Sequence, residues 1–370
     1  NDCGSVLNLN TLASVTVNES DGLGEFKEGA SYIYTDKDII DMYRANDPSV
    51  TRDTSIQKVT KTGANRGSQE NPYVISSVED WEKFVKLVGN DANKGEGQYY
   101  FLAKDLDFTG KEFYPVIEFR GTFYGSGHSI KNIDCSNWQY WNGSAYAPIT
   151  TQSKNHYGLF CNTNGVTVTD LNLEQYSFQE MPAPSSDMAV GGITGVSDGN
   201  DYFLNCHTSG LINSTIAYDN YLYYSGIVGQ RVGSSSALQI YRCSSELECH
   251  IIKKNSICAI MIGGMIGEVY DCQGEISIYD CVSNVVCSAF IGRGQHSGGI
   301  IGLAQLARSI QIENTVATMD NTSTLAQDSG VLGCFWDSSA RIKNCYVEGK
   351  YGEEENKKSM YAIVKNSGSS

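Results

Sequence analysis

The residues best suited to bind a ligand are aromatic and lie in two clusters. One cluster holds Trp138, Tyr140 and Trp141, with Tyr146 nearby, and the other holds Tyr218, Tyr221, Tyr223 and Tyr224. Exposed rings on a rigid scaffold suit stacking on sugar rings or packing into a protein partner. The alternative is that both segments fold back over neighbouring strands, because Tyr is common at half-buried strand positions.

Two motifs suggest catalysis, but each has a simpler explanation. Asp105 and Asp107 flank Leu106 and resemble a carboxylate pair for acid–base chemistry, whereas acidic residues at such a position also accept hydrogen bonds in turns. Gly195–Gly199 matches the G-x-S-x-G nucleophile elbow, which requires a strand before it and a helix after it. No helical pattern follows here, so no catalytic residue is predicted and the chain is not expected to be an enzyme.

Metal-binding patterns are equally weak. Asp198, Asn200 and Asp201 could supply oxygen ligands to Ca²⁺, but a solvated turn explains them better. The five His are scattered, and neither H-E-x-x-H nor C-x-x-C occurs. The sequence therefore predicts no metal site and no cofactor.

A repeated phrase organises the elements that must position these residues. It consists of Gly, two or three apolar residues and often a second Gly, and its spacing is 34, 34, 38, 35, 31 and 32 residues. The copies begin at Gly158, Gly192, Gly226, Gly264, Gly299, Gly330 and Ala362. Repeats of this period indicate a solenoid or another stacked array.

A second phrase interleaves with the first and marks a corner. An apolar residue is followed two positions later by Asn or Asp and then by Cys or another apolar residue, as in Phe203–Cys206 and Ile278–Cys281. Asn and Asp tolerate the left-handed backbone of a tight bend, and Arg242 is the exception at this position. Alternation after the bend predicts that Cys281 and Ser283 point inward and Val282 outward.

Two or three short strands per repeat, without a helical pattern between them, describe one coil of a parallel β-helix. The expected third strands include Leu247–Ile251 and Val285–Ala289. The sequence thus predicts an all-β, right-handed parallel β-helix of about seven coils, with the handedness taken from the crossover rule.

The twelve Cys fit such a solenoid. Cys206, Cys243, Cys281 and Cys345 recur at one repeat position, and Cys249 and Cys287 recur at another. Stacked Cys of this kind act as small buried apolar residues, and parallel side chains favour reduced thiols over disulfides.

The composition restricts the partners. The net charge is −15, which argues against nucleic acid and anionic membranes. No apolar run reaches the length of a membrane span, and no signal peptide is seen. If the protein is exported, we expect that the chain begins after processing or is a cloned segment.

Three segments are expected along the chain. Residues 1–66 show no repeat and have no assigned role, although Asp36–Arg44 suggests a short helix. Residues 67–130 should form the start and cap of the solenoid. A helix over Val78–Val88 would begin at Ser77 and end at Gly89, and strands are expected at Tyr32–Tyr34 and within Gln98–Asp107. Residues 131–370 form the repeats.

The chain resembles bacterial cell-surface β-helix proteins with GLUG-type repeats, which occur N-terminal to IgA peptidases and in adhesin-like proteins. The resemblance begins at Asn71–Ile75 and continues through Phe101–Asp107, Tyr114–Ile117 and Phe119–Ile130. Tyr124–His128 departs from the Asp-Gly-Asn-Gly-His of that family. The resemblance implies the β-helix fold and an exported bacterial protein at the cell surface.

These observations predict a non-catalytic surface module, adhesin-like, that binds a host or microbial glycan or a surface protein. The candidate ligand-binding residues are Trp138, Tyr140, Trp141, Tyr218, Tyr221, Tyr223 and Tyr224. One alternative is a polysaccharide lyase or glycoside hydrolase, which would need carboxylates and Lys or Arg together on one face. The other is a purely structural stalk, in which the aromatic residues would be buried.

Overall fold

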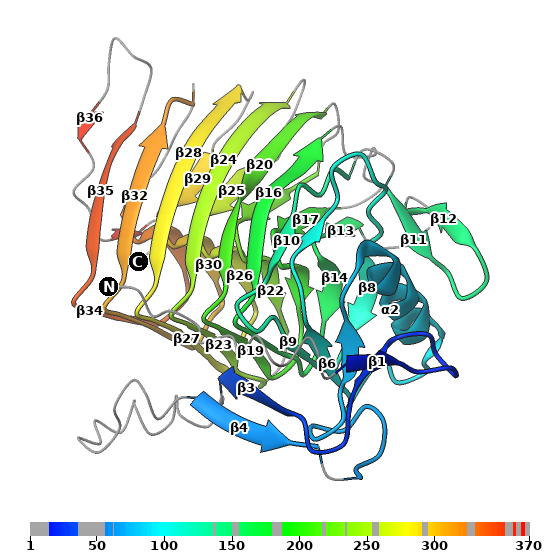
Figure 1. Ribbon diagram of the computed structural model, residues 1–370. Coiled ribbons are helices and arrows are strands. Elements are labelled where there is room, and N and C mark those ends of the chain that lie inside the picture. The colour runs from blue at the N-terminus through cyan, green and yellow to red at the C-terminus, as the bar shows by residue number, and fades with distance from the viewer. Residues whose placement is uncertain are drawn as a thin grey trace.

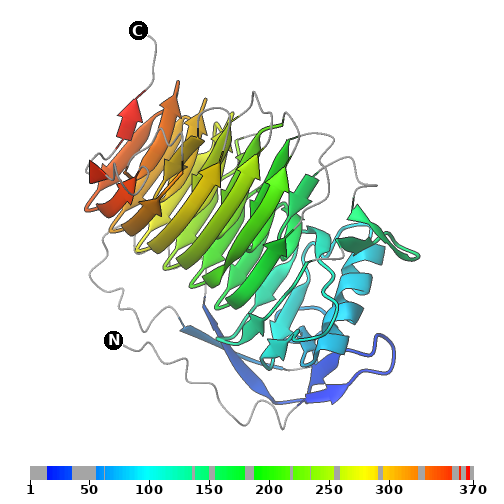
Figure 2. The same cartoon turned by 90° about the horizontal axis from the view of Figure 1, so that it is seen from above.

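The protein is a parallel β-solenoid in a computed structural model (Figures 1 and 2). The structure describes residues 15–35, 56–61, 63–135, 138–149, 155–179, 187–216, 220–233, 235–253, 259–290, 295–323, 330–351, 358–359 and 364–366. The predicted all-β parallel solenoid is confirmed. The predicted helix at 36–44 lies outside these residues.

A complete coil contains four strands, one in each of four parallel sheets that we call faces I to IV. One coil consists of β17 (Met188–Gly191), β18 (Thr194–Ser197), β19 (Asp201–Leu204) and β20 (His207–Ile216). The prediction of two or three strands was therefore too low. The repeated Gly phrase lies at the bend between face I and face II. The strand expected at Leu247–Ile251 is present as part of the longer β24 (Ser244–Lys253).

The remaining strands stack on these four faces. Face I contains β13 (Asn155–Tyr157), β17, β21 (Leu222–Ser225), β25 (Ile260–Gly263) and β29 (Gln295–Gly298). Face II contains β8 (Val116–Phe119), β14 (Phe160–Thr163), β18, β22 (Val228–Val232), β26 (Ile266–Tyr270), β30 (Ile301–Gln305), β33 (Leu332–Trp336) and β37 (Val364–Asn366). Face I thus has five strands and face II eight, so the number of coils differs slightly from the predicted seven.

Face III contains β5 (Tyr73–Ile75), β6 (Tyr99–Leu102), β9 (Thr122–Tyr124), β15 (Thr167–Thr169), β19, β23 (Leu238–Tyr241), β27 (Glu275–Tyr279), β31 (Ser309–Glu313) and β34 (Ala340–Lys343). Face IV contains β7 (Leu106–Asp107), β10 (Ser129–Lys131), β16 (Asn172–Gln179), β20, β24, β28 (Val282–Phe290), β32 (Val316–Asn321) and β35 (Tyr346–Tyr351), with β36 (Lys358–Ser359) antiparallel at its edge. The expected strand within Gln98–Asp107 is split between β6 and β7, which lie on different faces.

The corners between faces III and IV have the predicted left-handed backbone. Asn205 has φ of 52°, and its amide nitrogen donates to Asp170 Oδ1 of the preceding coil at 2.8 Å. Asn314 donates in the same way to Asp280 at 3.0 Å. Arg242 also adopts φ of 52°, a left-handed conformation that Asn and Asp tolerate better than Arg does. Alternation resumes after each bend, since Val282 is exposed and its neighbours Cys281 and Ser283 are buried.

The glycines between faces I and II allow this bend to approach face IV closely. A Cβ built on Gly226 would lie 1.7 Å from Ser245 Oγ, and one on Gly264 would lie 2.5 Å from Ser283 Oγ. Face IV accordingly places small residues opposite the bend, in one register row through Thr208, Ser245, Ser283 and Ala317. The glycine bend and face IV therefore lie close together along this row of residues. A side chain at either glycine would displace the opposite strand.

The predicted Cys rows lie inside the solenoid. Cys206, Cys243 and Cys281 are buried free thiols, and the Cys243 sulfur accepts a hydrogen bond from the backbone N–H of Cys206 at 3.4 Å. Cys249 and Cys287 are paired in register on face IV and are also free. Burial raises the pKa of the Cys206, Cys249 and Cys281 thiols well above the ordinary value. Cys3 and Cys258 lie outside the described residues.

Helix α2 (Val78–Asn90) covers the N-terminal part of the core (Figure 1). Ser77 caps it as predicted, accepting from Asp80 N at 3.1 Å, while the Asp80 carboxylate accepts from Ser76. Its apolar face packs on the aromatic residues of the first coils, with Phe84 against Tyr100 and Phe119. Gly89 does not end the helix as predicted, because the helix continues to Asn90.

Part of the N-terminal segment joins the solenoid. Strands β1 (Val15–Val17) and β2 (Gly24–Phe26) add antiparallel to the edge of face III through β5. Beside them, β3 (Ser31–Thr35), at the predicted position, forms a separate hairpin with β4 (Ile56–Thr60). Lys61 binds Glu25 at 2.7 Å, which ties the end of the hairpin to β2.

Arg242→Asn should be more stable than Arg242→Ala by about 1–2 kcal/mol, because Asn tolerates the left-handed backbone and its amide can donate to Asn205. Guanidinium unfolding at 25 °C measures the difference. Equal stability of the two variants would contradict the role of the corner amides.

Native protein treated with iodoacetamide should remain unlabelled at Cys206, Cys249 and Cys281, because the reagent cannot reach fully buried thiols. Half-buried Cys345 should react, although more slowly than a free thiol, because partial burial raises its pKa as well. Peptide mass spectrometry reports each site, with the denatured chain as the control. A disulfide-linked peptide joining Cys206 to Cys243 would overturn the reduced ladder.

Candidate functional site

The first aromatic cluster forms a hairpin beside the helical cap. Strands β11 (Gln139–Trp141) and β12 (Tyr146–Pro148) pair antiparallel. Trp141 donates from Nε1 to Asn90 Oδ1 at 2.8 Å, and Tyr146 donates to Glu82 at 3.1 Å. The Lys86 ammonium lies 5.3 Å from the Trp141 ring and 5.4 Å from the Tyr146 ring. These contacts fix the hairpin against α2.

Gly89 leaves room for this arrangement. A Cβ at Gly89 would lie 2.7 Å from Trp141 Cδ1, so any larger residue would push the indole away from the helix. The glycine that sequence analysis assigned to the helix end instead seats the hairpin.

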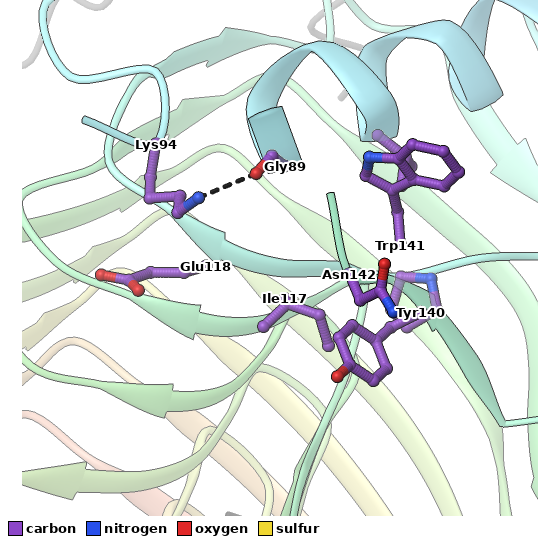
Figure 3. Close-up of a pocket in the computed structure, with 9 residues that line it drawn as sticks. Gly89, Lys94, Ile117, Glu118, Tyr140, Trp141 and Asn142 are labelled. Carbon is purple, nitrogen blue, oxygen red and sulfur yellow. Dashed lines mark hydrogen bonds between the residues drawn. The ribbon is translucent and has the colours of Figure 1, made fainter. Parts of the chain in front are cut away.

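A pocket of about 210 Å³ lies where the hairpin, the end of α2 and β8 meet (Figure 3). Trp141 supplies aromatic surface, and Tyr140 borders the pocket although it is only 8% exposed. Asn142, Lys94 and Glu118 supply polar groups. The other lining residues are Val85, Gly89, Pro115 and Ile117. Apolar walls with a few convergent polar groups are typical of small-ligand sites.

The polar side chains are held in place by neighbours. Lys94 donates from Nζ to the Gly89 carbonyl at 2.9 Å (Figure 3). Glu118 Oε1 accepts from Arg120 Nε at 2.9 Å and from Nη2 at 2.6 Å, and this pairing raises the pKa of Arg120. Asn142 accepts from the backbone N–H of Ser144 at 2.9 Å, which shapes the hairpin turn. These hydrogen bonds hold the polar lining of the pocket in a defined arrangement.

The predicted ligand-binding residues do not form one site. Tyr140 and Trp141 line the pocket, but Trp138 is buried, donates from Nε1 to the Gln179 carbonyl at 3.1 Å and packs on Tyr157. Its prediction as a binding residue is wrong because its ring belongs to the core.

The described tyrosines of the second aromatic cluster lie in or beside β21 and face in different directions. Tyr224 is 0% exposed and faces the core, so it is also removed from the candidates. Tyr223 faces outward but is buried against neighbouring strands, whereas Tyr221 is 42% exposed at the strand edge. Tyr218 lies outside the described residues. Among the described residues of this cluster, only Tyr221 has an exposed ring, and it does not line the pocket.

Sequence patterns did not identify Lys94 and Glu118. Lys94 follows the helix with φ of 56°, and Glu118 points outward from β8. Neither residue belongs to a motif, because the pocket is assembled from a loop, a strand and a hairpin that are far apart in sequence.

A second polar cluster lies outside the bend between faces I and II. Glu268 is 3% exposed, and Gln230 donates to its Oε2 at 2.6 Å. Tyr223 lies beside the same carboxyl and is 3.4 Å from Asp187 through its hydroxyl. Burial, reinforced by the charge of Asp187, raises the pKa of Glu268 to about 7 despite the hydrogen bonds from Gln230 and Tyr223.

A carboxyl group with a shifted pKa often marks a functional site, but the Glu268 carboxyl is buried. Besides its polar neighbours, Glu268 is paired in register with Leu303, which belongs to an outer apolar cluster with Ala189, Val196, Met261 and Cys334. Its side chain is 3% exposed, and within the described residues it is in no ion pair with Lys or Arg. Glu268 is therefore a poor candidate for the catalytic carboxyl that the lyase or hydrolase alternative requires.

The remaining motifs have structural partners. Ser197 of the G-x-S-x-G match is buried, donates to Asp201 at 2.7 Å and accepts from the buried Arg231 at 3.0 Å. Asp201 also accepts from Thr163 at 2.8 Å, so it is not available to the proposed calcium loop. Asp105 accepts from Ser129 N at 3.0 Å, in agreement with a role in turns.

The described residues contain no group of three or more His, Cys, Asp or Glu that could hold a metal ion. Within the same residues, no helix is long and apolar enough to cross a membrane.

Comparisons with known proteins give few matches. No protein-family model matches the chain, so the GLUG assignment stays a prediction. Halomucin from Haloquadratum walsbyi is 24% identical over 192 residues, which span 49% of this chain and 2% of halomucin. A crystal structure of a candidate immunoglobulin A1 protease from Bacteroides ovatus matches with a TM-score of 0.47 and 17% identity over 80% of each chain. That similarity carries no information on activity.

Glu268→Gln should change how stability depends on pH. The folded-state pKa near 7 lies above the ordinary glutamate value of 4.5. Folding therefore binds a proton in this range, and wild-type stability falls as pH rises from about 4.5 to 7. The variant should be more stable than wild type by up to about 3 kcal/mol at pH 8 and similar at pH 4.

Chemical denaturation at both pH values measures this difference, with Glu246→Gln, an exposed carboxylate on face IV, as the matched control. An equal effect of Glu268→Gln at pH 4 and pH 8 would exclude a buried carboxyl that titrates near neutrality.

Proposed function

We propose that the protein is a non-catalytic, exported surface module that binds carbohydrate in the pocket between α2, β8 and the β11–β12 hairpin. The observation that carries the proposal is the combination of Tyr140 and Trp141 with three fixed polar side chains in one pocket. Aromatic rings contact the apolar faces of sugars, while neighbouring polar groups select hydroxyls. The solenoid serves as a rigid support.

Several features support binding rather than turnover. The pocket contains a single carboxylate, Glu118, which is paired with Arg120. Glycoside hydrolysis ordinarily uses two carboxyl groups on opposite sides of the scissile bond. Glu268, the carboxyl group whose pKa is raised by burial, is 3% exposed and does not line the pocket. Export to the cell surface is supported by the resemblance to bacterial surface β-helices.

A stalk without ligand is the competing function, and the buried positions of Trp138, Tyr223 and Tyr224 favour it. The pocket distinguishes the two proposals, because a pure spacer has no need for an aromatic cavity at its capped end.

Retention of the purified chain on an array of host and microbial polysaccharides tests the proposal. Trp141→Ala should weaken retention about tenfold or more, since truncating a central aromatic contact costs on the order of 1–2 kcal/mol. Tyr221→Ala removes an exposed ring away from the pocket and should leave retention unchanged.

Thermal unfolding of both variants confirms that they fold, and Trp141→Phe provides a milder change if Trp141→Ala does not. Release of soluble sugar from the array would refute the non-catalytic assignment. Equal retention of wild type and a folded Trp141→Ala variant would remove the pocket from the binding site.

A further inference from the structure

The charges around the pocket differ from those of the whole chain. The net charge is −15, but the charged groups at the pocket are few. Glu82, which contacts the hairpin, binds Lys86 at 2.7 Å, and Glu118 of the pocket lining binds Arg120 at 2.6 Å. Asp91 lies in the same loop as Lys94, where its carboxylate accepts from the backbone N–H groups of Asn93 and Gly95. Lys94 is the one cation in the pocket lining, and within the described part of the chain its ammonium is in no ion pair.

The position of this ammonium leaves it available. An ammonium group has three N–H donors, and Lys94 uses one of them for the Gly89 carbonyl at 2.9 Å. That bond holds Nζ at the pocket wall beside the end of α2 (Figure 3). The remaining donors suit a negatively charged acceptor, for which hydrogen bonds are stronger than for a neutral one.

The opposite parts of the pocket suit the rest of a sugar. Tyr140 and Trp141 provide ring surface, and Asn142 lies next to them on the hairpin. Only Oε1 of Glu118 is held by Arg120, which leaves Oε2 as an acceptor for a hydroxyl group. Because the Glu118–Arg120 pair is neutral overall, it does not cancel the charge of Lys94.

We propose that this pocket is specific for an acidic sugar residue, whose anionic group binds Lys94 while its ring packs on Trp141 and Tyr140. The inference rests on the proposed carbohydrate-binding function and names the ligand class. The shared chemistry is an anion on a pyranose-sized ring, carried as a carboxylate or as a sulfate ester.

Paired probes separate charge from shape. Oligogalacturonate and hyaluronan oligosaccharides are compared with the same oligosaccharides after methyl esterification of the carboxyl groups, and dextran sulfate is compared with dextran. Binding is measured by calorimetry at low and high salt. The acidic member of at least one pair should bind about tenfold more tightly, and raising the salt should weaken that member alone.

The variant that tests the assignment is Lys94→Met, which removes the ammonium and keeps an unbranched side chain. It should bring the acidic-to-neutral affinity ratio close to one while leaving affinity for the neutral probe unchanged. Lys104→Met removes an exposed charge that does not line the pocket and should preserve the ratio. Lys94→Arg retains the charge and should keep most of the preference, should Lys94→Met prove unstable.

The outcomes distinguish the two proposals. Equal binding of acidic and neutral probes, or an unchanged ratio in Lys94→Met, would overturn the acidic-sugar inference and leave carbohydrate binding intact. If the protein binds no polysaccharide on the array, both the proposed function and this inference are overturned. A preference confined to carboxylate pairs or to the sulfate pair identifies which anion the site takes.

Discussion

In-register stacking of successive coils is the constraint on which the rest of the structure depends. Phe203 on face III pairs with Val168 of one neighbouring coil and Ile240 of the other, and the same one-to-one pairing recurs on the other faces. The backbone N–H and C=O groups within the stack form hydrogen bonds with the neighbouring coils. Every coil must therefore bend at equivalent positions. Side chains at equivalent positions are then neighbours about 4.8 Å apart.

This constraint explains why a few residue types recur. The corners need a left-handed residue whose side chain can bond the next corner, which Asn and Asp provide at Asn205 and Asp170. The bend between faces I and II crosses toward face IV, so Gly226 and Ser245 must both be small. Cys fits the interior rows because it is compact and apolar, and it remains a free thiol.

The candidate site lies where the periodicity is interrupted. The β11–β12 hairpin has no counterpart among the four faces, and it packs on α2, the one helix in the described part of the chain. Repeated coils give repeated surfaces, whereas a pocket that combines Trp141, Lys94 and Glu118 requires elements that occur once. The pocket also differs in access from the site of Glu268: the pocket is open to a ligand, whereas the Glu268 side chain is 3% exposed.

The sequence by itself determined the solenoid, because period, corner residues and alternation are local properties that stacking repeats in every coil. It identified the bends at Asn205 and Arg242, the inward Cys rows and the buried face of the helix containing Trp81. Only the tertiary structure decided which aromatic residues remained at the surface. Trp138 and Trp141 look alike in sequence, yet one enters the core and the other is held at the surface by Asn90 and the space above Gly89. The pocket depends on contacts between distant segments, and no periodic pattern encodes such contacts.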